Sequence, residues 1–208
     1  MNKELEKKNL EHRMELLRSQ IHPHFLFNTL NNLYSLAVDQ SKKVPEIIIK
    51  ISNILRYMLK EYNKKVVSLS EELDIIFTYI ELEKLRYGEQ LNIEINNEVK
   101  EIYQSIIKGP PLVLFTFVEN AFKHGPGKSI NNSWIKIDIK YIYGELIFKV
   151  ENNKEEIESN HRNNQNGLGL KNAKTTLDLY FHNKYKLDIL KNQDSFKIEL
   201  KINYKNEN

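Results

Sequence analysis

A histidine and an amide four residues apart, His24 and Asn28, could carry phosphoryl chemistry in the segment QIHPHFLFN at residues 20–28. If the apolar seam through Leu26 faces inward, His24 lies about 200° around the helix and faces outward, with Asn28 on the same side. A neutral imidazole nitrogen can accept a phosphoryl group, and an amide can orient the ring. On spacing alone, a solvated helix face without any chemical role is the simpler interpretation.

A second polar group interrupts an apolar helix pattern in the segment FVENAFKHG at residues 117–125. Glu119 and Lys123 are four residues apart, as are Asn120 and His124, so their side chains gather on adjoining faces of one helix. Such groups are costly to bury without partners. A hydrated magnesium ion with phosphates would satisfy them. The alternative is a helix end with one ion pair and cationic residues near its C-terminus.

Two weaker signals come later in the chain. Asn152 ends an alternating strand pattern, and its amide could read the edge of a base, although asparagine is also a common strand terminator. A helix pattern begins with two glycines spaced by one residue, in Gly167, Leu168, Gly169 and Leu170. Such an entry exposes backbone N–H groups to an anion, but glycine-rich helix entries are common. The polar stretch 154–165 before it is expected to be a mobile lid.

Helical patterns position the first of these groups. Residues 5–39 have coiled-coil spacing, with a kink predicted at Pro23. A second helix is predicted from 45 to 62, with an apolar stripe of Ile47, Ile48, Ile51, Ile54, Leu55 and Met58. Because two such helices cover each other only in part, we expect them to dimerise into a four-helix bundle. A third helix is predicted from Ser70, as its N-cap, to Tyr87 and Gly88.

The remainder of the chain alternates between strand and helix patterns. Strands are predicted around residues 91–95, 135–141, 146–150, 187–189 and 196–202, and helices over 111–124 and 168–181. The predicted fold class is α+β. A helical hairpin is followed by an α/β sandwich in which helices cover one face of a mostly antiparallel sheet.

Composition excludes several classes of protein. The 208 residues contain no cysteine, which excludes disulfides, zinc–thiolate sites and a cysteine nucleophile and fits a reducing, cytoplasmic setting. A net charge of +3, from 31 basic and 28 acidic residues, gives no special reason to expect nucleic acid. The mean hydropathy of -0.55 and the lack of a long apolar run exclude a membrane span within this sequence.

Four features taken in their order along the chain resemble the LytS-type sensor histidine kinases. They are the His24 segment, the segment with Glu119 and Asn120, the strand-end Asn152 and the segment with Gly167 and Gly169. The signature of that family is a His-Phe-Leu-Phe-Asn segment followed by an ATPase domain of the gyrase/Hsp90-like class. The resemblance covers nearly the whole chain, including residues 69–73, 80–88 and 110–111. It implies a helical dimerisation and phosphoacceptor region over 1–66, a connecting helix over 67–90, and an ATP-binding catalytic domain over 91–208.

The resemblance also implies roles for single residues. His24 would be the phosphoacceptor, oriented by Asn28, and Glu119 stands where the ATPase relatives keep a general base. Asn120 would ligate Mg²⁺. The remaining nucleotide contacts would come from Lys123, His124, Asn152, Gly167, Leu168, Gly169 and Leu170. One position departs from the family, because Asn152 and Asn153 stand where its members usually have Asp followed by Asn.

The function expected from this resemblance is that of a two-component sensor kinase. ATP would phosphorylate His24, and the phosphoryl group would pass to an aspartate of a response regulator of the LytTR type. The chain would be a homodimer and the cytoplasmic portion of a sensor whose membrane segments lie outside this sequence. An ATP-binding, dimeric pseudokinase without phosphotransfer is the alternative, favoured slightly by the neutral amide of Asn152.

Overall fold

The computed structural model describes residues 40–61, 64–124, 133–153 and 168–205, and also residues 30, 31, 33, 34, 37 and 38. The chain divides into two compact units, residues 1–60 and residues 61–208. His24, Asn28, Gly167, the predicted kink and the predicted lid lie outside the described residues. Within the described ranges, the helices are too short or too polar to cross a membrane.

In the first unit, α3 (Val44–Glu61) begins one residue before its predicted start and has Pro45 in its first turn. Its buried residues are spaced four, three and four apart: Ile47, Ile51, Ile54 and Met58. Two members of the predicted stripe are less buried, since Leu55 is half-buried and Ile48 is 46% exposed. The buried stripe is therefore narrower than predicted, and its apolar edge is left exposed.

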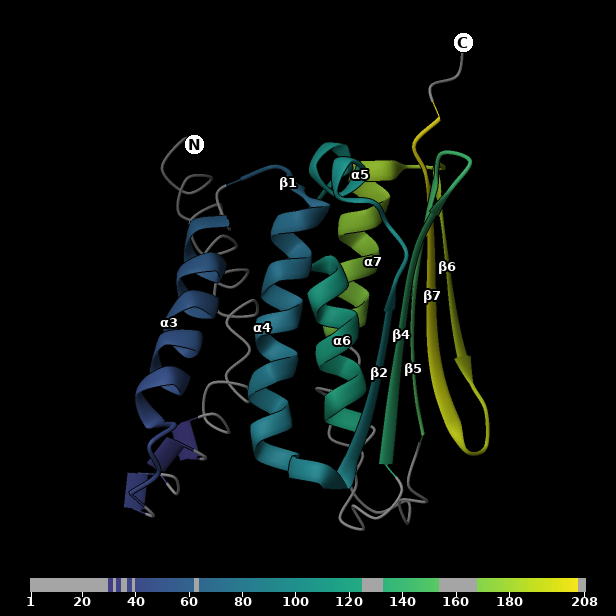
Figure 1. The fold of residues 1–208 in the computed structure, drawn as a ribbon. Coiled ribbons are helices and arrows are strands. Elements are labelled where there is room, and N and C mark those ends of the chain that lie inside the picture. Colours follow the sequence, from purple (N-terminus) through teal and green to yellow (C-terminus); the bar gives the residue numbers. More distant parts are fainter. Residues whose placement is uncertain are drawn as a thin grey trace, which may run out of the picture. The chain divides into compact units, whose positions relative to one another are not determined.

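The second unit is built on a five-stranded sheet. The strands are β2 (Leu91–Asn97), β4 (Ser133–Ile142), β5 (Glu145–Asn153), β6 (Tyr185–Lys191) and β7 (Ser195–Asn203). Their order is β2-β4-β5-β7-β6, and β2 is parallel to β4 while the other neighbours are antiparallel (Figure 1). The prediction of a mostly antiparallel sheet is confirmed. The parallel pair is possible because a helical connection separates β2 from β4 along the chain.

Three helices cover one face of this sheet, namely α4 (Leu69–Tyr87), α6 (Val113–His124) and α7 (Leu168–Phe181) (Figure 1). Because side chains alternate along a strand, every second residue of the central strands points toward these helices. The buried residues of this layer include Ile135, Ile137, Ile139, Leu146, Phe148, Val150, Ile198, Leu200 and Ile202. The predicted α+β class is confirmed. A short helix, α5 (Glu101–Ile106), and a small sheet of β1 (Val67–Ser68) and β3 (Lys108–Gly109) were not predicted.

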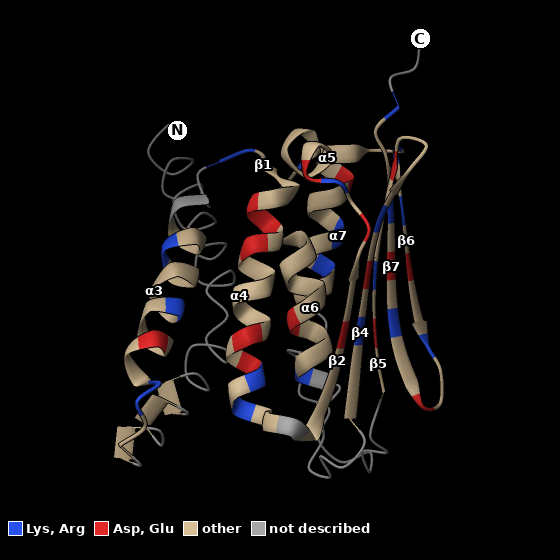
Figure 2. Ribbon diagram, in the orientation of Figure 1, with Lys and Arg blue, Asp and Glu red and all other residues tan. Residues whose placement is uncertain are grey.

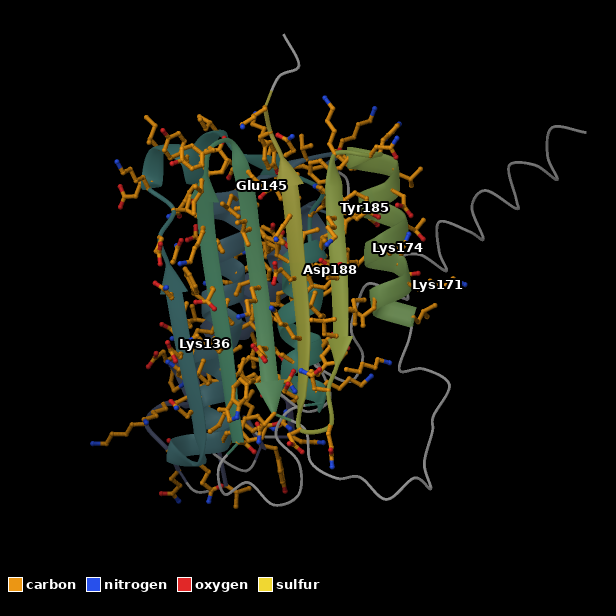
Figure 3. The ribbon with its side chains drawn as sticks, turned by 90° about the vertical axis from the view of Figure 1, so that its right-hand side faces the viewer. Lys136, Glu145, Lys171, Lys174, Tyr185 and Asp188 are labelled. Atoms are coloured by element: carbon orange, nitrogen blue, oxygen red, sulfur yellow. The ribbon has the colours of Figure 1, made fainter. Side chains whose placement is uncertain are left out.

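The opposite face of the sheet carries charged side chains where the first face carries apolar ones (Figure 3). Lys136 on β4 pairs with Glu94 on β2 at 2.9 Å. On β7, Glu199 pairs with Lys197 at 2.8 Å and with Lys201 at 3.0 Å. A shift of one residue in strand register would turn these charges into the core, so the charge pattern decides which face the helices cover.

A capping box begins α4, two residues earlier than predicted. The hydroxyl of Ser68 accepts a hydrogen bond from the Glu71 N–H at 3.2 Å, and the Glu71 carboxylate accepts one from the Ser68 N–H at 2.8 Å. The prediction of Ser70 as N-cap is wrong, because the pairing of β1 with β3 ends at Ser68 and frees the chain to turn there. At the other end, Gly88 has a φ of 59° and closes the helix as predicted.

The helix predicted as a connection over 67–90 corresponds to α4. It lies within the second compact unit and packs against α6. Its buried apolar residues include Leu73, Ile76 and Ile80. Acidic side chains follow its length and basic ones occupy its last turn (Figure 2). This helix therefore belongs to the helical layer of the second unit.

Candidate functional site

One end of the second unit gathers the residues that the sequence singled out. The last turn of α6 and the last residues of β5 lie there, together with the first residues of β4 and of α7 (Figure 1). The helix α6 packs against both α7 and β5. This end thus holds the predicted residues Asn120, Lys123, His124 and Asn152. It also holds Leu168, Gly169 and Leu170, the described part of the predicted glycine box (residues 167–170).

The position of α6 is set by a glutamate that the sequence analysis missed. Glu72 of α4 is only 3% exposed. Its carboxylate accepts hydrogen bonds from the backbone N–H of Leu112 at 2.9 Å and from that of Phe115 at 3.1 Å. The first N–H groups of a helix have no partner within the helix, and a negative charge there is favoured by the helix dipole. A side chain of α4 therefore caps α6.

Adjacent residues of the α6 motif face different neighbours. Phe115 and Phe122 lie four residues before and three residues after Glu119, and their rings contact Tyr79 of α4 with centroids at 5.1 and 5.3 Å. Residues at these spacings share one helix face, so Glu119 lies on the side of α4. Its carboxylate is close enough to contribute to raising the pKa of Tyr79, although burial is the larger cause.

Asn120 lies on the side of α7. Thr116, one turn before it, has its methyl carbon 3.5 Å from where a Cβ of Gly169 would stand. The side chain of Asn120 is buried, with 8% of the residue exposed, and its Nδ2 has no hydrogen-bond partner among the described residues. A buried donor without a partner costs about 1–3 kcal/mol, so this amide fits a ligand atom that would accept its hydrogen bond.

Asn152 is fully buried at the end of the central strand β5. Its Nδ2 donates to the carbonyl of Asn153 at 2.9 Å, which leaves Oδ1 pointing elsewhere, and Oδ1 has no partner within the described ranges. The next residue secures the strand end, because the Asn153 Oδ1 accepts a hydrogen bond from the Trp134 N–H at 2.8 Å. A buried acceptor at this place fits the exocyclic amino group of an adenine.

The glycine box is described only in part. Leu168 is the first residue of α7 and is exposed, while Gly169 and Leu170 are half-buried. A side chain at Gly169 would make an ordinary contact with Thr116 and no clash, so packing does not require a glycine there. On α6, Lys123 is exposed and His124 ends the helix.

A polar cluster on α4, which the sequence analysis also did not identify, lies near Glu119. Glu83 is 6% exposed, and its Oε2 lies 3.2 Å from a guanidinium nitrogen of Arg86. Arg86 also donates to the Tyr87 hydroxyl at 2.6 Å. Burial raises the pKa of Glu83, and the Glu119 carboxylate raises it further, while Arg86 and a hydrogen bond from Tyr79 oppose the shift.

The described residues contain no group of three or more His, Asp or Glu side chains that could hold a metal ion by themselves. Mg²⁺ is commonly bound by one or two protein ligands together with phosphate oxygens and water. At this end of the unit, Mg²⁺ would therefore need a phosphate-bearing substrate to supply most of its ligands. A small apolar cavity of about 30 Å³ lies at the other end of the unit, near Leu69, Val113 and Phe181, and has room for about one water molecule.

Comparison with known proteins agrees with this geometry. Residues 12–91 match the family model described as histidine kinase. The chain is 37% identical over 142 residues to the protein YwpD of Bacillus subtilis (strain 168), which covers 67% of this chain and 50% of that protein. It is 26% identical over 200 residues to the sensor protein LytS of Staphylococcus saprophyticus, which covers 91% of this chain and 33% of that protein.

The fold has a counterpart among solved structures. The histidine kinase domain from the Erythrobacter litoralis EL346 blue-light activated histidine kinase aligns with a TM-score of 0.50 at 11% identity, over 84% of this chain and 96% of that domain. This chain spans half or less of the length of the two curated relatives named above. Residues 12–91 thus match the histidine kinase family, and the chain is similar over most of its length to the LytS sensor proteins.

Proposed function

We propose that this chain is the kinase portion of a two-component sensor. It uses ATP to phosphorylate its own His24 and passes the phosphoryl group to an aspartate of a response regulator of the LytTR type. The observation that carries the proposal is the pair of buried amides at one end of the sheet unit, Asn152 with an unpartnered acceptor and Asn120 with an unpartnered donor among the described residues. Both are satisfied by a nucleotide, and the family supplies the class of reaction.

In this proposal, different residues of the site bind different parts of ATP. The Oδ1 of Asn152 accepts a hydrogen bond from the adenine amino group, which orients the base. Asn120 binds Mg²⁺ with its oxygen and donates its Nδ2 hydrogen bond to a phosphate oxygen. Lys123 and His124 add positive charge at the phosphates, and the backbone N–H groups of Gly167, Leu168, Gly169 and Leu170 complete the anion site. Bound Mg²⁺ neutralises phosphate charge.

The transfer step needs few groups. A neutral ring nitrogen of His24 forms the N–P bond to the γ-phosphorus while the bond from that phosphorus to the bridging oxygen of ADP breaks. Glu119 takes up the proton from the other ring nitrogen, and Asn28 holds the ring in orientation. The protein contributes mainly by positioning and by charge, as is usual for phosphoryl transfer.

Dimerisation through the first unit is part of the proposal. The stripe of α3 is buried at Ile47, Ile51, Ile54 and Met58, while Ile48 at its edge is exposed. An apolar edge of this kind next to a buried stripe suits a second copy of the same helix, which would complete a four-helix bundle.

Incubation of the full chain with ATP labelled on the γ-phosphate, in the presence of Mg²⁺, tests the enzyme activity. We expect a protein-bound label that is lost in acid and retained in alkali, as a phosphohistidine is. Nucleotide binding without label would instead establish the pseudokinase, the alternative that the neutral Asn152 favours.

A further inference from the structure

Two neighbouring asparagines end the central strand β5 and bind different partners. The side chain of Asn152 is buried on the face that the helices cover, and its Nδ2 donates to the backbone carbonyl of Asn153 at 2.9 Å. Because side chains alternate along a strand, Asn153 lies on the opposite face, where its Oδ1 accepts a hydrogen bond from the Trp134 N–H of β4 at 2.8 Å. Asn153 therefore connects the backbone of β4 with the amide of Asn152.

The two ends of the Asn152 amide are chemically different, since Nδ2 can only donate a hydrogen bond and Oδ1 can only accept one. The Asn153 carbonyl can only accept, so it binds the Nδ2 end. In the reversed orientation two oxygen atoms would face each other and the amide N–H would lose its buried partner, which disfavours that orientation about tenfold or more. Asn153 therefore fixes Oδ1 as the end of the amide that has no partner among the described residues.

The side chain of Asn153 makes its own carbonyl available for this contact. The strands β4 and β5 form a hairpin with a two-residue turn, 143–144. In such a hairpin the two residues that flank the turn exchange backbone hydrogen bonds, and so does every second pair beyond them. Counted in this way, Trp134 and Asn153 stand opposite each other in a pair of this kind. The Trp134 N–H is bound by the Asn153 side chain, which leaves the carbonyl to Asn152.

We propose that Asn153 is a positioning residue for base recognition, which holds the Asn152 amide so that the site accepts an adenine nucleotide and rejects a guanine nucleotide. The proposal rests on the proposed function, in which Asn152 contacts the base. Adenine carries an amino group at the position where guanine carries a carbonyl. A fixed Oδ1 pairs with the amino group, whereas it would face the guanine carbonyl oxygen with no hydrogen between them. The choice needs no charged side chain, because the orientation of one neutral amide decides it.

The test compares the Kd for ATP with the Kd for GTP, each in the presence of Mg²⁺, by calorimetric titration of the full chain. We expect the parent protein to prefer ATP about tenfold or more. In Asn153→Ala, the carbonyl at position 153 returns to the Trp134 N–H and the Asn152 amide is free to turn. ATP should then bind more weakly and GTP at least as well as before, so that the preference falls about fivefold or more. A merely structural role of Asn153 would weaken both nucleotides together.

Two further variants serve as controls. Asn153→Asp keeps an oxygen for the Trp134 N–H and should retain most of the parental preference for ATP. Asn97, the last residue of β2, also accepts a backbone N–H with its Oδ1, that of Val99 at 3.1 Å. It lies away from the site, because β2 runs parallel to β4 and β4 begins at the site. Asn97→Ala should therefore leave the preference unchanged.

A measurement on the parent protein covers the case in which Asn153→Ala folds poorly. The hydrogen bond from Nδ2 to the Asn153 carbonyl should slow the hydrogen exchange of the Asn152 side-chain amide in the ATP complex. NMR of isotope-labelled protein follows this exchange. Rapid exchange of this amide would show that its orientation is not fixed and would overturn the inference.

The outcomes separate the inference from the proposed function. The inference alone would be overturned by a parent protein that binds ATP and GTP equally, by an unchanged preference in Asn153→Ala, or by an equal weakening of both nucleotides in that variant. A parent protein that binds neither nucleotide would overturn the proposed function, and the inference with it. A preference for ATP without labelling of the protein would support the inference and count against the phosphotransfer step.

Discussion

The carboxylate of Glu72 accepts a hydrogen bond from the backbone N–H of Leu112, a residue 40 positions further along the chain. With the second bond, from Phe115, this contact ties the start of α6 to the body of α4. Leu112 has a φ of 64°, so the chain turns sharply there before the helix begins. A single buried side chain therefore fixes the start of the helix that carries Glu119 and Asn120.

Replacing Glu72 should destabilise the sheet unit more than replacing its neighbour Glu71. Glu72→Ala leaves two buried N–H groups without partners, and we expect a loss of about 2–3 kcal/mol in the free energy of unfolding. Glu71→Ala removes a partly exposed capping box and should cost about 1 kcal/mol. Denaturant unfolding checks both values. Asp74→Ala, an exposed acid on the same helix, is the control, and an equal loss in all three variants would contradict the assignment of Glu72.

Nucleotide binding should respond differently to the two buried amides. Asn152→Ala removes one neutral hydrogen bond, worth on the order of 1 kcal/mol, and should weaken ATP about fivefold while leaving some kinase activity. Asn152→Asp restores an acid and should tighten ATP. Asn120→Ala removes the Mg²⁺ ligand and should abolish autophosphorylation. Calorimetric titration with ATP and Mg²⁺ measures these effects, with the exposed Asn92→Ala as control. Normal labelling in Asn120→Ala would mean that the pocket is assigned wrongly.

His24 should be the residue that carries the label, and not His22 or His12. His24 has Asn28 four residues later on its own face, whereas His22 is set about 100° from the seam position Ile21 and therefore faces elsewhere. His24→Gln should lose the phosphohistidine, and His22→Gln should keep it. Label that survives in His24→Gln and disappears in His22→Gln would reverse the assignment.

The oligomeric state should depend on the exposed edge of the α3 stripe. Ile48→Glu puts a charge where a second copy would pack, and we expect a shift from dimer to monomer at micromolar concentration. Ile49→Glu is the matched control, because Ile49 is exposed and lies about 200° from Ile47, away from the stripe. Sedimentation velocity of the full chain distinguishes the two. A parent protein that sediments as a monomer would disprove the dimer.

The ion pairs of Glu199 on the charged face of the sheet should persist to an unusually low pH. Hydrogen bonds from Lys197 and Lys201 lower the pKa of Glu199 from 4.5 to about 2. Because the pKa is lower in the folded protein, this contribution to stability is present above pH 4.5 and is lost as the pH falls toward 2. Titration followed by NMR should show Glu199 still ionised at pH 3, and an ordinary midpoint near 4.5 would contradict this. In Glu199→Gln, the dependence of unfolding free energy on pH should be weaker between pH 5 and 2.

Local patterns in the sequence predicted most of the elements. The bounds 168–181 of α7 agree with the structure, α6 begins two residues after its predicted start, and the five principal strands appear where alternation indicated them. Alternation predicts the strands here because one face of each strand is apolar and the other is charged, so consecutive residues differ in polarity. The sequence also singled out Asn120, as a polar residue inside an apolar helix pattern, and Asn152, as a polar residue at a strand end, and the structure buries both.

Other features were decided only when distant segments came together. The N-cap of α4 is Ser68 and not the predicted Ser70, because the pairing of β1 with β3 ends at Ser68 and Glu71, three residues later, completes a capping box there. The sequence alone predicts only charged positions of an amphipathic helix at Glu72, Glu83 and Arg86. The backbone partners of Glu72 lie some 40 residues away and are set by the packing of α4 against α6, whereas Glu83 and Arg86 pair within α4 itself. The Glu72 carboxylate becomes a cap only once that packing has removed it from water.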